Sequence, residues 1–279
     1  MQLRIVHTTT FAYDGKASAS LNQARLTPVT SPEQILVHSR IEVHPTPWTY
    51  DYRDYYGNLV TAFEIMDEHD HLTVTATSTV QTEPRHPGEQ HLGWGDLGAW
   101  EVADRWTEFL ILPDVVAPPE DFASRVKDVA AGAATPADAA AAVAGLVRAE
   151  VEYQPGATGV HSLAADAWGQ RAGVCQDMAH LVIGGLRSLG IPARYVSGYL
   201  HPAPDPIVGL QVTGQSHAWV EWWDGAWRAI DPTSGVGLDD RYVTVAVGRD
   251  YSDVKPLSGI YSGSGSSTMT VDVQITRLS

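Results

Sequence analysis

The single cysteine of this 279-residue sequence, Cys175, lies in a pattern that suits a nucleophile. A thiol attacks a carbonyl carbon as the thiolate, and the N-terminus of a helix favours that anion. Apolar residues follow it at spacings of three and four, which predicts a helix with one buried face that Gly190 and Pro192 end. These apolar residues are Met178, Leu181, Val182, Leu186 and Leu189. The backbone N–H of Cys175 would then be free to stabilise an oxyanion.

A histidine and an aspartate further along the chain could complete this chemistry. Residues 216–223 and 227–231 are rich in aromatic and β-branched types and flank Asp-Gly-Ala at 224–226, which predicts a hairpin. A two-residue turn would send His217 and Asp231 to opposite faces of this hairpin. A three-residue turn makes them diagonal neighbours on one face, within reach of a hydrogen bond. We therefore predict the three-residue turn.

The three residues together have the composition of a nucleophilic triad. Asp231 would accept a hydrogen bond from one imidazole nitrogen of His217, which fixes the tautomer and leaves the other nitrogen for the thiol of Cys175. Taken singly, each residue has an ordinary structural interpretation, as a small buried hydrophobe, a half-buried histidine of a sheet and a turn residue before a proline. Their coincidence in one chain favours catalysis.

Four segments carry a resemblance to a known family. They are Gly-Val-Cys-Gln-Asp-Met-Ala-His-Leu (173–181), Gly-Ile-Pro-Ala-Arg-Tyr-Val-Ser-Gly-Tyr (190–199), Ser-His-Ala-Trp-Val-Glu (216–221) and Ile-Asp-Pro-Thr (230–233). Their residues and their order resemble the papain-related core of the transglutaminase-like superfamily, in which the Cys, His and Asp form the triad. The residues upstream are similar to the all-β N-terminal domain that precedes this core in bacterial members.

The resemblance and the residue patterns together predict an α+β protein. An N-terminal antiparallel β-sandwich-like domain at 1–84 would be followed by a linker at 85–104. A transglutaminase-like core at 105–260 would then pack the helix that carries Cys175 on an antiparallel sheet. Residues 261–279 alternate between apolar and polar types and should return to the β-domain as a strand.

Local patterns support this organisation. The alternation of apolar and polar residues at 35–44 is typical of a half-buried strand. Helices are predicted at 119–131 and from Thr135 onward, where Pro136 occupies the first helical position. The Gly- and Ser-rich stretch 258–267 is predicted to be a flexible connection.

The resemblance implies a thiol-dependent enzyme that transfers the acyl group of an amide, in a peptide or protein substrate, through a thioester. Water as the acceptor would make it a cysteine peptidase or amidase, whereas an amine would make it a transglutaminase. We favour hydrolysis, because water is abundant and the sequence shows no second substrate site. The alternative is a non-catalytic scaffold whose β-domain binds a partner.

Charge, hydropathy and cysteine content indicate which partners and which compartment to expect. A net charge of −15 disfavours nucleic acid and anionic membrane surfaces. The sequence contains no apolar run of the roughly 20 residues that span a membrane, and its first residues alternate where a signal peptide would be continuously apolar. A single cysteine forms no internal disulfide, and a reducing compartment would protect a thiolate. We therefore expect a cytoplasmic protein with no nucleic-acid or membrane partner.

Other residues have competing interpretations. Trp168 precedes the nucleophile and Trp219 follows His217, so both could line a substrate site or simply fill space between helix and sheet. His180 lies on the predicted helix away from the face of Cys175 and is a fallback base only. Residues 67–71 (Asp-Glu-His-Asp-His) have metal-ligand types but fall at a predicted hairpin tip, where polar residues are common. No metal and no cofactor are expected.

Overall fold

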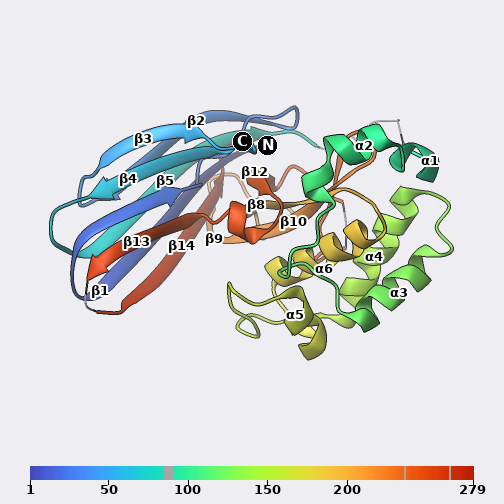
Figure 1. Ribbon diagram of the computed structural model, residues 1–279. Coiled ribbons are helices and arrows are strands. Elements are labelled where there is room, and N and C mark those ends of the chain that lie inside the picture. Colours follow the sequence, from blue (N-terminus) through green and yellow to red (C-terminus); the bar gives the residue numbers. More distant parts are fainter. Residues whose placement is uncertain (85–90, 236, 264) are drawn as a thin grey trace.

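The chain forms a β-sandwich joined to a core of helices packed on a smaller sheet (Figure 1). The computed structural model describes residues 1–84, 91–235, 237–263 and 265–279. The predicted fold class is therefore confirmed, with an N-terminal antiparallel sheet followed by an α+β core. No helix in these described ranges is long and apolar enough to cross a membrane.

The sandwich is built around one very long strand. Its strands are β1 (Gln2–Ala24), β2 (Gln34–His44), β3 (Trp48–Arg53), β4 (Leu59–Ile65), β5 (His69–Thr82), β9 (Gln211–Thr213), β13 (Leu257–Gly263) and β14 (Ser267–Arg277). The first half of β1 pairs with β5 and β14, and its second half pairs with β4 and β13. Phe63 on β4 and Leu72 on β5 belong to one buried apolar cluster, so these two strands face each other across the interior.

The C-terminal stretch differs from the sequence prediction at one point. The sequence predicts a flexible connection at 258–267, of which residue 264 lies outside the described residues. Instead, Leu257–Gly263 forms β13 and pairs antiparallel with β1, and β14 begins at Ser267. The reason is steric and local, because a Cβ at Gly259 would lie 2.2 Å from the side-chain oxygen of Asn22 on β1. Glycine here allows close approach of two backbones, which its composition alone does not distinguish from flexibility.

In the chain, short helices follow the first five strands and precede the longer helices of the core, and they lie on the core side of the molecule (Figure 1). The predicted linker covers 85–104, of which residues 85–90 lie outside the described residues. The rest contains α1 (Trp94–Leu97) and α2 (Trp100–Arg105), and η1 (Thr107–Phe109) follows. The ring of Trp106 lies 4.7 Å from that of Trp223, which places this segment against the tip of the core hairpin.

The core has four longer helices and a four-stranded antiparallel sheet. The helices are α3 (Glu120–Ala130), α4 (Pro136–Glu150), α5 (Ala164–Gln170) and α6 (Cys175–Ser188). The sheet order is β11 (Trp227–Ile230), β10 (Gln215–Trp223), β8 (Ala193–Leu200) and β12 (Tyr242–Gly248). Smaller elements are the parallel pair β6 (Glu152–Tyr153) and β7 (Ala172–Gly173), and η2 (Tyr251–Asp253).

The predicted helix signals are confirmed. The side chain of Thr135 accepts a hydrogen bond from the backbone N–H of Asp138 at 3.1 Å, and Pro136 is the first residue of α4. α6 begins at Cys175, and Gly190 follows its end with a φ of 78°. Most residues of α6 are buried, because it lies between the other helices and the sheet.

Two side-chain amides of the sandwich hold the outer edge of the core sheet. Gln34 donates to the carbonyl of Thr244 and accepts from its N–H, both at 2.8 Å. Asn58 makes the same pair of hydrogen bonds with Val247, again at 2.8 Å. Residues from β1 and β14 also belong to the apolar cluster of the core, so the two parts share one continuous interior. The backbone groups of Thr244 and Val247 on this edge of β12 are thereby hydrogen-bonded without another strand.

Substituting Gly184 with alanine should destabilise the protein, because the added Cβ would lie 1.9 Å from the carbonyl oxygen of Val116. We expect the free energy of unfolding to fall by about 2 kcal/mol or more in a urea titration, since α6 must move to relieve the contact. Gly145→Ala is the matched control, because Gly145 lies in a helix with open space around it. That change should be neutral or stabilise by up to about 1 kcal/mol. Equal effects of the two substitutions would contradict this packing.

Candidate active site

The candidate nucleophile occupies the first position of α6, and a buried aspartate fixes the chain there. Asp177 accepts a hydrogen bond from the N–H of Val174 at 2.8 Å and another from the hydroxyl of Thr158 at 2.5 Å. A Cβ at Gly173 would lie 2.9 Å from that of Asp177, so glycine is needed for this close approach. Burial raises the pKa of Asp177, although these hydrogen bonds oppose the shift. The segment 173–177 thus positions Cys175 through its neighbours.

The hairpin brings the predicted base to its predicted partner. Trp223 pairs with Trp227 and Val220 with Ile230, which leaves three residues in the turn and confirms the predicted register. The Nε2 of His217 lies 2.8 Å from Oδ2 of Asp231. A carboxylate can only accept, so Nε2 carries the proton and Nδ1 remains for Cys175.

His217 contacts both of the other candidate residues. Burial by itself would lower the pKa of His217, but the hydrogen bonds with Asp231 and Cys175 outweigh it and raise the value to about 9. The side chain is only 11% exposed, so solvent screens these interactions weakly. The structure therefore brings Cys175, His217 and Asp231 together, and His217 lies in the middle.

Asp231 is fully buried and its two oxygens accept four hydrogen bonds. Oδ2 accepts from His217 and from the hydroxyl of Tyr242, both at 2.8 Å. Oδ1 accepts from the N–H of Thr233 at 2.8 Å and from its hydroxyl at 2.7 Å. Burial would raise the pKa of Asp231, but these donors, His217 foremost, lower it to about 2. The carboxylate is therefore charged at neutral pH and can hold the imidazole in one orientation.

Two of these donors were not identified from the sequence. Thr233 could have been found, because an Asp followed two residues later by a backbone donor and a hydroxyl is a common turn. Tyr242 begins β12, beyond a loop of unpredicted path, and no local signal connects it with Asp231. Burial beside Asp231 raises the pKa of Tyr242, so its hydroxyl keeps the proton that it donates.

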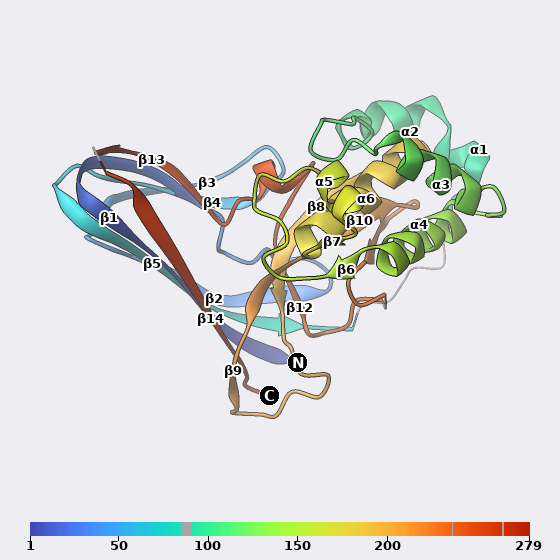
Figure 2. The ribbon, with the colours of Figure 1, turned by 90° about the horizontal axis from the view of Figure 1, so that it is seen from below.

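The nucleophile and the base open into a cleft of about 490 Å³ between the core and the sandwich. The core side includes Tyr153, Val174, Gln176, Tyr195, Ser197 and Ser216. The sandwich side includes Thr213 of β9 and three consecutive residues of β14, namely Val271, Asp272 and Val273. Figure 2 shows β14 on one side of this junction, with α6, β6 and β7 on the other.

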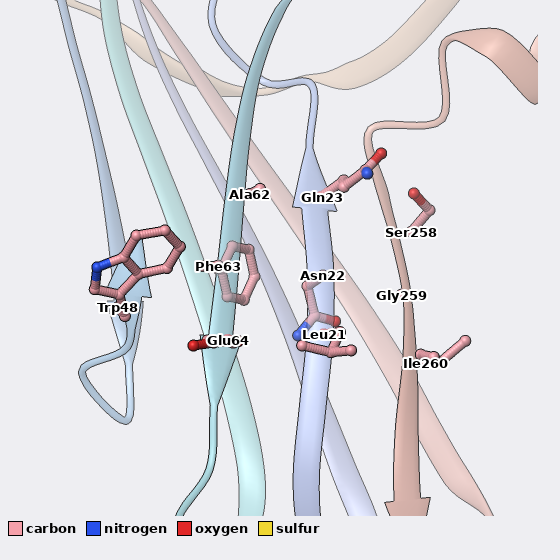
Figure 3. Close-up of a pocket in the computed structure, with 10 residues that line it drawn as sticks. All are labelled: Leu21, Asn22, Gln23, Trp48, Ala62, Phe63, Glu64, Ser258, Gly259 and Ile260. Carbon is pink, nitrogen blue, oxygen red and sulfur yellow. The ribbon is translucent and has the colours of Figure 1, made fainter. Parts of the chain in front are cut away.

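A second cavity of about 480 Å³ lies on the outer face of the sandwich (Figure 3). It is formed by β1, β3, β4 and β13, and its side chains include Trp48, Leu21 and Ile260. The residues that line it include neither Cys175 nor His217. The chemistry therefore assigns the candidate site to the cleft at the junction.

The two predicted substrate-contact tryptophans lie elsewhere. Trp168 is 2% exposed, and its indole N–H donates to Asp121 at 2.6 Å. Trp219 is 0% exposed and packs edge-on against Tyr242 at 5.5 Å, directly over Gly198. Neither is among the residues that line the cleft, so their position in the structure is that of packing residues. A role in substrate contact stays a prediction.

The other residues considered from the sequence have structural partners. His180 is fully buried, burial lowers its pKa to about 4, and its Nε2 accepts the N–H of Tyr251 at 3.2 Å. In the segment 67–71, His69 is buried and its Nδ1 lies 2.8 Å from the carbonyl oxygen of Asp67. Within the described part of the chain, no group of three or more His, Cys, Asp or Glu side chains is arranged to hold a metal ion.

Comparisons with known proteins cover nearly the whole chain. The family model for the bacterial transglutaminase-like N-terminal region matches residues 3–81, and the model for the transglutaminase-like superfamily matches 123–232. The chain belongs to the transglutaminase-like superfamily. The second match includes all three candidate residues.

Three relatives show the extent of this similarity. An uncharacterized protein of Mycobacterium leprae, ML0607, is 46% identical over 277 residues, which is 99% of each chain. The crystal structure of a "Putative Cysteine Protease" from Cytophaga hutchinsonii shares the fold, with a TM-score of 0.76 and 23% identity over 98% of this chain and 90% of the other. A protein-glutamine gamma-glutamyltransferase of Pseudomonas aeruginosa is 37% identical over 86 residues, which is 29% of this chain and 13% of that protein.

The raised pKa of His217 predicts a pH-dependent contribution to stability. Because its pKa is about 9 when folded and 6.5 when unperturbed, the contribution is complete below pH 6.5 and is lost as the pH rises through 9. The difference in unfolding free energy between wild type and His217→Ala should therefore shrink across this range in urea titrations. In a Cys175→Ala background the loss should occur at lower pH, because two interactions that raise the pKa are gone. A pH-independent difference would contradict the assignment.

Proposed function

We propose that this protein is a thiol-dependent acyl-transfer enzyme that acts on amide bonds and that Cys175, His217 and Asp231 are its catalytic triad. The single observation that supports this most is the placement of His217, which hydrogen-bonds to Asp231 through Nε2, lines the same cleft as Cys175 and has its pKa raised by both residues. A core histidine with only a structural role has no need of a thiol partner that also faces a cleft. The family assignment agrees with an enzyme of this general class.

The proposed mechanism begins with an ion pair. The pKa of about 9 for His217 means that the imidazole holds a second proton at neutral pH, and in our proposal the thiol of Cys175 supplies it. The sulfur attacks the carbonyl carbon of the substrate amide and forms a tetrahedral intermediate. The N–H of Cys175, at the first turn of α6, is a donor to its oxyanion.

Collapse of the intermediate breaks the C–N bond. His217 gives its proton to the leaving amine, and the acyl group remains on the sulfur as a thioester. The neutral imidazole then takes a proton from the incoming water or amine, which attacks the thioester and releases Cys175. Asp231 holds the imidazole in one orientation through all of these steps.

We propose water as the acceptor, so that the enzyme is an amidase or cysteine peptidase. The cleft that contains Cys175 is open to solvent, so water can reach the thioester. The alternative acceptor is a primary amine, as the name of the Pseudomonas aeruginosa relative implies for that protein. The other alternative, a scaffold without catalysis, predicts that a thiol-directed acyl probe leaves Cys175 unlabelled.

The triad proposal predicts turnover of glutaminyl or isopeptide amides by the wild type, and near-complete loss in Cys175→Ala and His217→Ala. We expect kcat/KM to fall about a thousandfold or more in both. It should fall somewhat less in Asp231→Asn, in which the imidazole of His217 is no longer held in the correct tautomer. Ammonia or amine release with and without an added primary amine measures hydrolysis against transfer. Asp70→Asn, at an exposed carboxylate on the sandwich, is the matched control and should retain full activity. Residual turnover in Cys175→Ala would refute the mechanism.

Alkylation tests the nucleophile without any substrate. Because Cys175 is the only thiol, the incorporation of iodoacetamide measured by mass spectrometry reports on this residue alone. We expect His217→Ala to slow alkylation at neutral pH by about tenfold or more, because the imidazolium partner of the thiolate is lost. His38→Ala, an exposed histidine of β2, is the control and should not change the rate. Equal rates in all three proteins would mean that Cys175 is not activated by His217.

A further inference from the structure

One edge of β14 is left without a strand partner beside the candidate active site. β1 pairs with β14 along its whole length, from Ser267 to Arg277. On the opposite edge, β9 pairs only with Gln274, Ile275 and Thr276. Figure 2 shows β9 beside one end of β14, from which β14 continues toward β13. In the described residues, no strand pairs with this edge between Ser267 and Asp272.

The backbone groups on this edge point toward the cleft. The N–H of Gly214 donates to the carbonyl oxygen of Val273 at 2.8 Å, so that carbonyl lies on the β9 edge of β14. Because backbone groups alternate between the two edges of a strand, the N–H and C=O of Val271 and Met269 lie on the same edge. Val271 and Val273 line the cleft that also contains Cys175 and His217. The unpaired edge thus leads directly to the candidate nucleophile.

This edge lacks the features that normally prevent pairing with another strand. Natural edge strands are usually blocked by lysine, proline, a bulge or a covering element. Residues 257–273 contain no lysine and no proline, and their one charged residue is Asp272. The register between β1 and β14 runs without a bulge. Met269 is 55% exposed and Val271 is 49% exposed, so apolar side chains also flank the free edge.

We propose that the acyl donor is an extended polypeptide segment that adds as a strand to this free edge of β14. The segment occupies the position that β9 would take if it continued past Gly214, and the N–H and C=O of Val271 and Met269 bind its main chain. This strand addition carries one residue of the segment past Cys175, where its amide is attacked. The inference rests on the proposed function, and it names the substrate as an extended polypeptide segment, not a small free amide.

Recognition through the main chain has consequences for specificity. Alternate side chains of the bound segment face the cleft and the others face solvent, so the sequence requirement is loose and repeats every second residue. A helical or tightly turned segment cannot pair with the edge and is excluded. The substrate must therefore be unfolded at the site of reaction.

Binding can be tested without turnover. The Cys175→Ala protein is titrated against a fluorescent peptide in which one glutamine is flanked by alternating valine and serine, and anisotropy reports binding. Two further peptides carry N-methyl groups on alternate backbone nitrogens. In one peptide the methylated nitrogens are those that would face β14, and in the other they are those that would face away from it. Methylation of the nitrogens that face β14 should weaken binding about tenfold, because the hydrogen bonds to β14 are lost. Methylation of the nitrogens that face away should have little effect on binding. Equal effects in both registers, or no binding, would overturn the inference.

A substitution in the edge provides a second test. Val271→Pro removes one N–H from the free edge without removing a bond to β1, and Val271→Thr keeps it. The ratio of kcat/KM for the extended peptide to that for a short blocked glutaminyl amide should fall about tenfold in Val271→Pro and change little in Val271→Thr. An unchanged ratio in both variants would overturn the inference.

The outcomes separate this inference from the proposed function. Register-specific binding with no turnover of any amide by the wild type would retain strand addition and reject the acyl-transfer proposal. Turnover of both substrates without register-specific binding would retain the acyl-transfer proposal and overturn strand addition. A wild-type dimer in sedimentation that Val271→Pro converts to a monomer would mean that a second copy pairs with this edge, and it would also overturn the inference.

Discussion

The geometry of the candidate site depends on one buried carboxylate. Asp231 is inaccessible to water, so the charge of its side chain must be satisfied by protein donors. Those donors come from three separate segments, at His217, Thr233 and Tyr242. Because removal of one partner from a buried ionic pair commonly costs about 3–5 kcal/mol, the arrangement is under strong energetic constraint. The imidazole is therefore held in place before any substrate binds.

The sandwich contributes to this constraint although it carries none of the three candidate residues. Gln34 and Asn58 bind the backbone of β12, the strand that begins with Tyr242, from outside the core sheet. The position of the tyrosine hydroxyl over Asp231 thus depends on side chains far away in the sequence. β14 in turn supplies one wall of the cleft through Val271 and Val273. The two parts of the chain share one interior, and the cleft with the candidate site lies at their junction.

The local elements of the site could be predicted because local rules determine them. The stripe of apolar residues after Cys175 specifies a helix, and Gly190 with Pro192 ends it. A three-residue turn is the one that places His217 and Asp231 on the same face of the hairpin, and the structure has this register. Each of these features involves residues close together in the chain, where spacing and turn chemistry are decisive.

What the sequence by itself determined is the place of the candidate nucleophile at the start of a helix, the pairing of His217 with Asp231 and the α+β class of the fold. Tertiary structure alone decided that Tyr242 completes the partners of Asp231, that Trp168 and Trp219 are buried, and that Leu257–Gly263 is a strand. It also decided that β14 borders the cleft and that, among the described residues, β9 pairs with only part of the edge on that side. The physical reason is that these features are contacts between segments far apart in the chain, and neither periodicity nor turn residues encode which distant surfaces meet.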